Sequence, residues 1–122
     1  MRGTLEFNSS VWHHSLTKEN EYDLERIQKS AVKIILGTNL LSYEDALSKL
    51  NMKTLKERRN ELLIKFTQKC LNVKQVKHLF PYGDKIHTME TRNNEEYKVT
   101  HCNTQTLKTS SIIQMQHILN RI

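Results

Sequence analysis

Apolar residues recur at three- and four-residue steps in several stretches of the chain, the spacing expected of amphipathic helices. The first stretch runs from about Glu19 to Leu36, the second from Tyr43 to Leu50 and the third from Leu55 to about Leu71. A shorter pattern of the same kind covers residues 110–121. We therefore predict a mainly α fold: a small helical bundle of three to five helices with a loosely packed C-terminal segment.

Capping residues mark the ends of these predicted helices. Thr17 can cap the start of the first helix, and Gly37 is suited to end it. Ser42 precedes the second helix in the same way. Before the third helix, Thr54 and Glu57 form a T-L-K-E capping box, which satisfies two free amide groups reciprocally.

Two of the helices carry a well-defined apolar stripe. In the first helix the stripe comprises Leu24, Ile27, Ala31, Ile34 and Ile35. In the third helix, the residues that we expect to be buried are Leu55, Leu62, Phe66 and Cys70, together with Leu63. These stripes predict that the first three helices pack together.

The two ends of the chain have weaker patterns. Residues 1–16 mix apolar and polar positions, which predicts an extended piece or the end of a helix that begins before Met1. Alternation over Tyr97–His101 predicts a short strand. We therefore divide the chain into a helical region, residues 1–80, and a C-terminal extension, residues 81–122, with a short strand and a terminal helix.

Composition narrows the class of protein. The chain has 122 residues, 37% of them hydrophobic, and its three Gly and one Pro disfavour a turn-rich β fold. Residues 1–17 lack the apolar stretch of a signal peptide, and no run approaches the ~18 apolar residues of a membrane span. We therefore expect an intracellular protein, cytoplasmic or nuclear, without a membrane partner. Cys70 and Cys102 are too far apart for a metal-binding pair, and burial is the expected state of Cys70.

Positive charge is concentrated in one part of the chain. The formal net charge is +6, yet residues 49–78 alone carry nine Lys/Arg against two Glu, a formal +7. The other 92 residues hold ten basic and eleven acidic groups. Two acids cannot neutralise nine bases, so this segment favours contact with a polyanion over a solvated, internally paired helix face.

Residues that could carry chemistry are sparse. Glu44-Asp45 lies in the first turn of a predicted helix, where capping explains it, and Glu95-Glu96 lies in a predicted loop. His13-His14 has no third ligand nearby, so surface or packing roles fit better than a metal site. Three Gly cannot supply a phosphate-binding loop. We expect no enzymatic activity, no metal and no cofactor.

Five segments follow one another in an order that resembles a known family. They are residues 5–17 (L-E-F-N-S-S-V-W-H, then L-T), 23–31 (D-L-E-R-I-Q-K-S-A), 42–47 (S-Y-E-D-A-L), 55–59 (L-K-E-R-R) and 66–70 (F-T-Q-K-C). Together they resemble the region after the palm of reverse transcriptases from non-LTR retrotransposons of the Jockey and RTE kind. The closing segments, residues 91–93 and 110–120, are similar to the end of those polyproteins.

This resemblance covers nearly the whole chain and implies a thumb-like helical region that grips RNA or an RNA–DNA hybrid without reading sequence. Positions that match the family pattern are Trp12, Arg26, Lys29, Tyr43, Arg58 and Arg59. Trp12 and Tyr43 are expected to pack. The candidates for contact with the nucleic-acid backbone are Arg26, Lys29, Lys53, Lys56, Arg58, Arg59, Lys65 and Lys69. The family's catalytic F/Y-x-D-D motif is absent from the chain, so the resemblance implies a non-catalytic fragment.

Two other functions remain open at this point. The second and third predicted helices, joined by a short turn, resemble a helix-turn-helix, with Arg58 and Arg59 near the start of the recognition helix. The chain could instead be a helical protein-interaction module that docks through an exposed apolar surface. Salt dependence distinguishes them, because binding to nucleic acid weakens steeply as salt rises and apolar docking does not.

Overall fold

The computed structural model describes residues 2–37, 42–83 and 96–121, and these residues are mainly helical. The elements in chain order are α1 (Arg2–Glu6), α2 (Ser9–Trp12), the 3₁₀ turn η1 (His13–Ser15), α3 (Lys18–Leu36), α4 (Tyr43–Lys49), α5 (Leu55–Asn72), the 3₁₀ turn η2 (Lys77–Leu79), α6 (Gln105–Lys108) and α7 (Ser111–Arg121). The bounds of α3, α4, α5 and α7 differ from the predicted ones by no more than one residue at either end. The mainly α class is therefore confirmed.

The helices begin where the capping residues predicted. The hydroxyl of Thr17 accepts a hydrogen bond from the Asn20 amide at the start of α3. Both halves of the capping box of Thr54 and Glu57 are formed at the start of α5. At the end of α3, Gly37 has a φ of 72°, a conformation that a side chain would strain.

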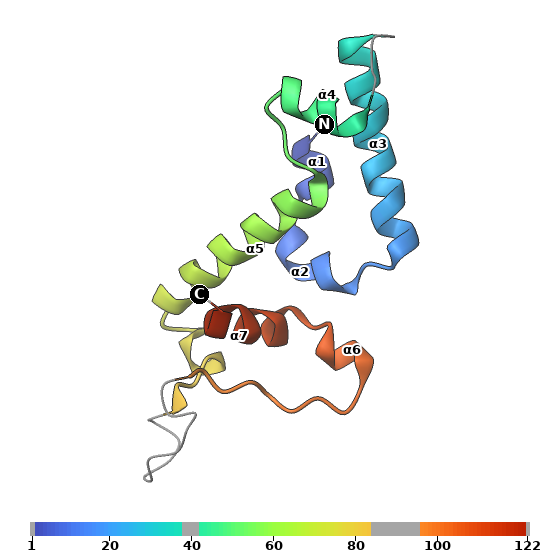
Figure 1. The fold of residues 1–122 in the computed structure, drawn as a ribbon. Helices are drawn as coiled ribbons and strands as arrows, with labels where there is room; N and C mark the ends of the chain where they lie inside the picture. The colour runs from blue at the N-terminus through green and yellow to red at the C-terminus, as the bar shows by residue number, and fades with distance from the viewer. Residues whose placement is uncertain (1, 38–41, 84–95, 122) are drawn as a thin grey trace.

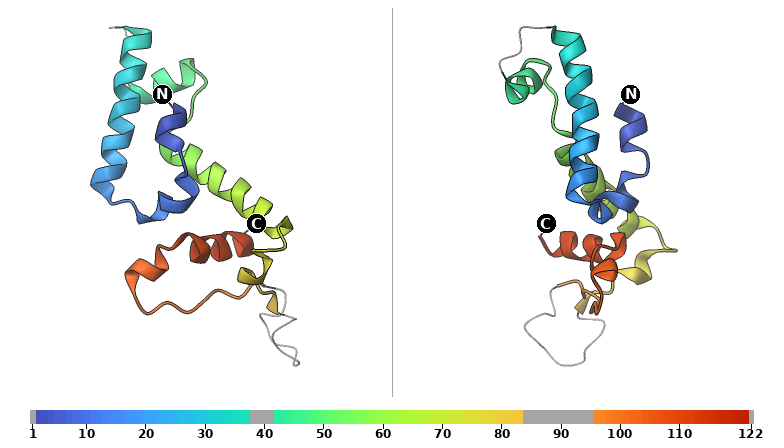
Figure 2. Two further views of the ribbon diagram at one scale, coloured as in Figure 1. Left: turned by 180° about the vertical axis from the view of Figure 1, so that it is seen from behind. Right: turned by 90° about the vertical axis from the view of Figure 1, so that its right-hand side faces the viewer.

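The fold is elongated, with α5 running through its middle (Figures 1 and 2). At one end of α5, helices α3 and α4 enclose a small core of Val32, Ala46 and Leu47. At the other end α7 crosses α5, and a second core contains Leu63 and Met115 together with Phe80. The N-terminal helices α1 and α2 lie beside α5 between the two ends.

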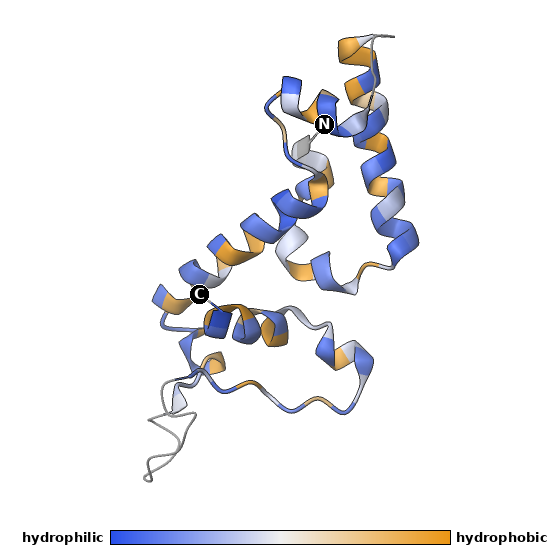
Figure 3. Ribbon diagram, in the orientation of Figure 1, coloured by the Kyte–Doolittle hydropathy of each residue, from blue (hydrophilic) through white to orange (hydrophobic). Residues whose placement is uncertain are grey.

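The buried face of α3 differs from the predicted apolar stripe. Gln28 and Val32 face inward, whereas Ile27, Ile34 and Ile35 are 45%, 84% and 65% exposed. The buried amide of Gln28 donates to the Tyr43 hydroxyl and to the Lys53 carbonyl, and these bonds fix the rotation of α3. The last turn of α3, coloured as hydrophobic in Figure 3, consequently holds two exposed isoleucines.

The stripe predicted for α5 is also rotated. Leu55 and Leu63 are buried as expected, but the other buried positions of this face are Arg59 and Thr67. Phe66 is 43% exposed, contrary to the prediction. A polar residue can replace an apolar one here because its hydrogen bonds are formed inside the protein; the Thr67 hydroxyl, for example, donates to the Leu63 carbonyl.

The predicted strand over Tyr97–His101 is wrong. Described residues 96–101 form a single antiparallel bridge, Tyr82 with Tyr97, flanked by hydrogen bonds from Gly83 to Glu96 and from Lys98 to Pro81. Alternation alone does not make a strand, because a strand also needs a partner, and among the described residues Tyr82 alone forms a bridge with this stretch. Asn93 and Glu95 lie outside the described residues.

The terminal helix α7 packs more closely than the sparse apolar content of this part of the chain led us to expect. The Gln116 side chain accepts from the Thr100 amide and donates to the Leu79 carbonyl, and it is 2% exposed. Asn120 likewise donates to and accepts from the backbone of Tyr97. Within the described part of the chain, no helix combines the length and the apolar character needed to cross a membrane.

Candidate nucleic-acid interface

The N-terminal half of α5 holds basic residues whose charges are met by acids from other helices. Lys56 lies 3.4 Å from a carboxylate oxygen of Glu21 in α3. Arg58 lies 3.3 Å from a carboxylate oxygen of Glu6 in α1. Both pairs join segments far apart in the sequence. The Arg58 pair involves a Glu6 side chain that is only 12% exposed, so Arg58 is less available to an outside partner, whereas Lys56 is 67% exposed and its pair is weaker.

Lys53, just before α5, is also paired. Its ammonium group donates to the carboxylate of Glu61, which lies eight residues later in the second turn of α5. The hydrogen bond from Lys53 lowers the pKa of Glu61. The pair is exposed, so it is weaker than a buried one and can exchange for a phosphate.

Arg59 is the candidate that the structure places out of reach. Its side chain is 1% exposed, and its Nε donates to Nδ1 of His13 at 3.3 Å. The guanidinium also lies 5.7 Å from the centre of the Trp12 ring, a cation–π distance. Burial lowers its pKa, while Glu21 and Glu25 act in the opposite direction. Arg59 is therefore a core residue that fixes α2 and η1 on α5, and we remove it from the candidate contacts.

The two candidates on α3 remain near the surface. Arg26 lies 3.9 Å from Asp23 on its own helix, a long ion pair, and both side chains are mostly exposed. Lys29 lies 5.0 Å from the centre of the Tyr43 ring and 5.9 Å from that of Tyr22. Tyr43 packs against the α3–α4 core, as expected.

Lys65 and Lys69 differ from the other candidates on α5. Both are exposed, and neither has an ion pair or hydrogen bond to any part of the chain that the structure describes. They are one helical turn apart and therefore project from the same side of α5. Leu62 and Phe66 interleave with them at three- and four-residue spacing, so one stripe of α5 combines two exposed cations with apolar side chains.

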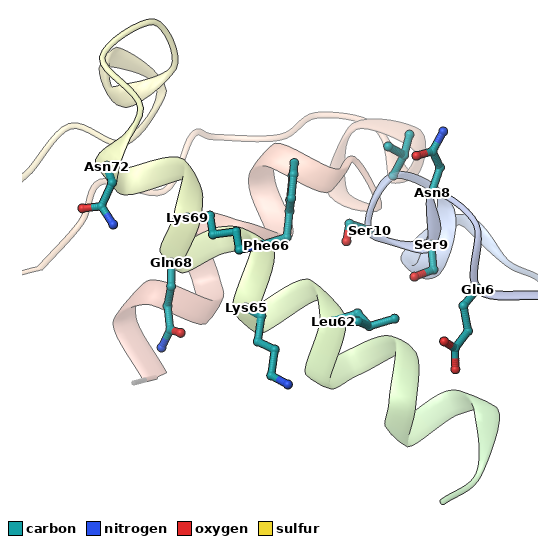
Figure 4. Close-up of a pocket in the computed structure, with 11 residues that line it drawn as sticks. Glu6, Asn8, Ser9, Ser10, Leu62, Lys65, Phe66, Gln68, Lys69 and Asn72 are labelled. Atoms are coloured by element: carbon teal, nitrogen blue, oxygen red, sulfur yellow. The ribbon is translucent and has the colours of Figure 1, made fainter. Parts of the chain in front are cut away.

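This stripe borders a groove between α5 and α2 with a volume of about 560 Å³. Its lining residues are Glu6, Asn8, Ser9, Ser10, Val11, Leu62, Lys65, Phe66, Gln68, Lys69 and Asn72. Figure 4 shows Leu62 directed from α5 toward Ser9 and Ser10 on the opposite wall. Because Glu6 is paired with Arg58, the groove carries the net positive charge of the two lysines.

The α2 wall of the groove is the part that sequence reasoning missed. Asn8 has a φ of 49°, a left-handed conformation that separates α1 from α2 and turns Ser9 and Ser10 toward α5. Asparagine tolerates this conformation better than most residues do. The sequence Asn8-Ser9-Ser10 is typical of a turn, and this local signal could have been recognised. The position of the turn opposite Phe66 could not, because it depends on packing between segments more than fifty residues apart.

The histidine pair lies in a second hollow of about 510 Å³, whose other lining residues are Leu16, Glu21, Lys56, Glu57, Asn60 and Arg121. His13 is 6% exposed, and the two rings are 4.6 Å apart. Burial, the charge on His14 and the charge on Arg59 lower the pKa of His13 to about 4. His13 is therefore a neutral packing residue, which is one of the two roles, surface or packing, that the sequence predicted. The described residues contain no group of three or more His, Cys, Asp or Glu side chains placed to hold a metal ion.

The geometry gives little support to a helix-turn-helix. In that motif the first turns of the second helix must enter a DNA groove. Here Leu55 and Arg59 are buried in the first turns of α5, and Lys56 and Arg58 face acids of α3 and α1.

Comparison of the chain with models of known protein families, with curated proteins and with solved structures found no match.

Proposed function

We propose that this chain is a non-catalytic helical module that contacts nucleic-acid backbones without reading their sequence, in the manner of the thumb-like region of a non-LTR retrotransposon reverse transcriptase. The observation that carries the proposal is the pair of exposed lysines on α5, Lys65 and Lys69, which form no hydrogen bond or ion pair with the described residues and lie in a segment with a formal charge of +7. When an ammonium group neutralises a phosphate, it displaces counterions that had condensed on the nucleic acid, and the release of these ions favours binding.

The basic residues of α5 differ in their contacts from one end of the helix to the other, and this difference supports the proposal. Toward its start, Lys56 and Arg58 bind acids of the same chain and build the fold. Further along, Lys65 and Lys69 are left for a partner. Arg26, Lys29 and the exposed pair of Lys53 and Glu61 would add weaker contacts. The absence of an F/Y-x-D-D motif from the sequence supports the non-catalytic part of the proposal.

The test is fluorescence anisotropy of the full chain with labelled RNA–DNA hybrid, duplex DNA and single strands across a salt titration. We expect affinities that fall steeply with salt for all of these ligands. The double variant K65E/K69E should weaken binding to each of them and reduce the salt slope by about one for each lysine.

The matched control is K18E/K108E, which makes the same change in net charge at exposed lysines of α3 and α6. It should reduce affinity much less. A folded wild-type chain that binds none of the ligands at low salt would overturn the proposal, and equal losses in the two double variants would remove Lys65 and Lys69 from it.

Docking of a protein partner is the second candidate function, and one observation favours it. Ile34 and Ile35 at the end of α3 are 84% and 65% exposed, an unusual position for adjacent isoleucines. If this surface carries the function, I34S/I35S should abolish association with the partner without altering its salt dependence, while K65E/K69E leaves the association intact.

A further inference from the structure

The groove between α2 and α5 combines positive charge with an apolar, partly aromatic lining. Its apolar lining includes Phe66, 43% exposed, and Val11, 64% exposed, together with the partly buried Leu62. Lys69, three residues after Phe66, shares its face of α5, and Lys65, one turn before Lys69, lines the same groove. An aromatic face beside two cations is the combination that single-stranded nucleic acids use, with a base on the ring and phosphates on the cations.

We propose that an unpaired base enters this groove and stacks on Phe66, while Lys65 and Lys69 hold the phosphates on either side of it. This inference rests on the proposed function and adds a preference to it: single strands, and the unpaired ends of duplexes, should bind more tightly than blunt duplex. A base inside a duplex is stacked on both faces and paired along its edge, so it cannot reach the ring.

The size and the polar groups of the groove fit this occupant. Its volume of about 560 Å³ lies within the range of sites that hold small organic molecules. Asn8, exposed on the α2 wall, offers an amide that can donate and accept. One such amide can meet the edge of any base, so the groove would not select a sequence.

Charge argues against other occupants. With Glu6 paired to Arg58, the groove keeps the charge of two lysines, which favours a polyanion over an apolar helix. A second copy of this chain, with a net charge of +6, would be repelled by the same lysines.

The experiment measures the ratio of affinities for a labelled single strand and for the same strand in a blunt duplex, in DNA and in RNA. We expect the single strand to bind more tightly. F66A should lower single-strand affinity by about 5- to 150-fold, the factor that corresponds to the loss of one base–aromatic stack. Duplex affinity, which depends on the lysines, should not change.

Phe7 provides a matched control, because it is 73% exposed and lies next to the groove without lining it. Its carbonyl accepts from the Trp12 indole, a backbone contact that F7A retains. F7A should therefore leave the ratio unchanged. F66L, which keeps apolar bulk but loses the ring, should resemble F66A and so separate stacking from packing.

Photo-cross-linking supplies a second readout. A single strand that carries 5-iodouracil should cross-link to Phe66, as identified by mass spectrometry of the digested adduct, and the K65E/K69E variant should lose the cross-link. An unchanged ratio in F66A without a cross-link at Phe66 would overturn the inference while leaving the proposed function standing. Absence of binding to every ligand would instead overturn both the inference and the proposed function. If the wild-type chain self-associates and F66A changes the mass of the assembly, the groove would be assigned to a second copy of the chain.

Discussion

Arg59 and His13, forty-six positions apart in the sequence, meet in the interior of the protein, where Nε of Arg59 donates to Nδ1 of His13 at 3.3 Å. The bond requires a neutral imidazole with its proton on Nε2, because a protonated ring has no acceptor. The guanidinium charge and the neighbouring His14 both oppose protonation of His13. This contact gives the protein a pH dependence that does not depend on any ligand.

The first prediction concerns pH. Because the pKa of His13 is about 4 in the folded state and 6.5 in the unfolded chain, the unfolded state binds more protons between these values. Stability should be full above pH 6.5 and fall as the pH drops toward 4, by an amount on the order of 2 kcal/mol. Urea unfolding of the wild type at pH 4.5 and pH 7 measures this loss.

The variant H13Q should show a smaller difference between the two pH values, since the group that titrates is gone. H117Q, which changes an exposed histidine of α7, should behave as the wild type does. His14 has its pKa lowered in the same direction by burial and by Arg121, so some pH dependence should remain in H13Q. Identical pH profiles for wild type and H13Q would contradict this account.

The second prediction separates Arg59 from the exposed lysines. R59A removes a large, fully buried side chain and should cost about 2–4 kcal/mol of unfolding free energy. R59M keeps the volume and removes a terminal nitrogen, Nη1, that is buried without a hydrogen bond to the described residues. It should cost less than R59A by at least ~1 kcal/mol and leave nucleic-acid affinity unchanged. A loss of affinity in folded R59M would return Arg59 to the contact surface.

The third prediction tests the polar junction of three helices. The Tyr43 hydroxyl accepts from Gln28 and donates to one carboxylate oxygen of Glu25, whose other oxygen accepts from the Leu55 amide at the start of α5. Y43F should therefore cost about 1–3 kcal/mol, because part of a buried network loses its partner. Y22F changes an exposed tyrosine of α3 and should cost less than about 0.5 kcal/mol.

A double-mutant cycle of Y43F with E25Q measures the coupling within this junction. We expect an interaction energy of about 0.5–3 kcal/mol, the range found for residues of one hydrogen-bond network. Strictly additive losses would mean that the two side chains act independently, and the description of a shared junction would then be wrong.

The fourth prediction concerns the capping box of α5. T54A leaves the Glu57 amide without its hydroxyl partner and should reduce stability by about 1 kcal/mol, within the usual range of about 0.5–2. S48A is the control, because the exposed Ser48 hydroxyl donates to the Glu44 carbonyl one turn back in α4 and caps no helix start. Its effect should stay within about 0.5 kcal/mol in either direction. Equal midpoints for T54A and wild type in urea would rule out a stabilising cap.

The ends of the helices could be predicted from sequence because they depend on local chemistry. Thr17, Ser42 and Thr54 each accept a hydrogen bond from an amide three residues later, so the signal and its effect lie within one helical turn. The rotation of each helix could not be predicted in this way. Gln28 and Arg59 occupy buried positions because partners 15 to 46 residues away satisfy them, and no local pattern records such partners.

In the candidate site, too, the local features could be predicted from sequence and those that depend on distant partners could not. Charge counting located the basic segment, and Lys65 and Lys69 lie in it as exposed residues. It could not identify which cations are already bound, because Lys56 and Arg58 meet acids 35 and 52 residues away. Nor could it place the α2 wall of the groove opposite Phe66.

The two apolar cores at opposite ends of α5 have a consequence for the cooperativity of unfolding. The core of α3 and α4 contains no residue of α5 and is joined to that helix through Glu25, Gln28 and the pair of Lys56 with Glu21. Apart from the buried Leu55, the contacts named here that join this core to α5 are polar, and water can replace such contacts more easily than it can replace apolar packing. Backbone amides of α3 and α4 should accordingly exchange with solvent deuterium through a separate, lower-energy opening while those of α7 stay protected, so that one short chain behaves as two folding units that share a central helix.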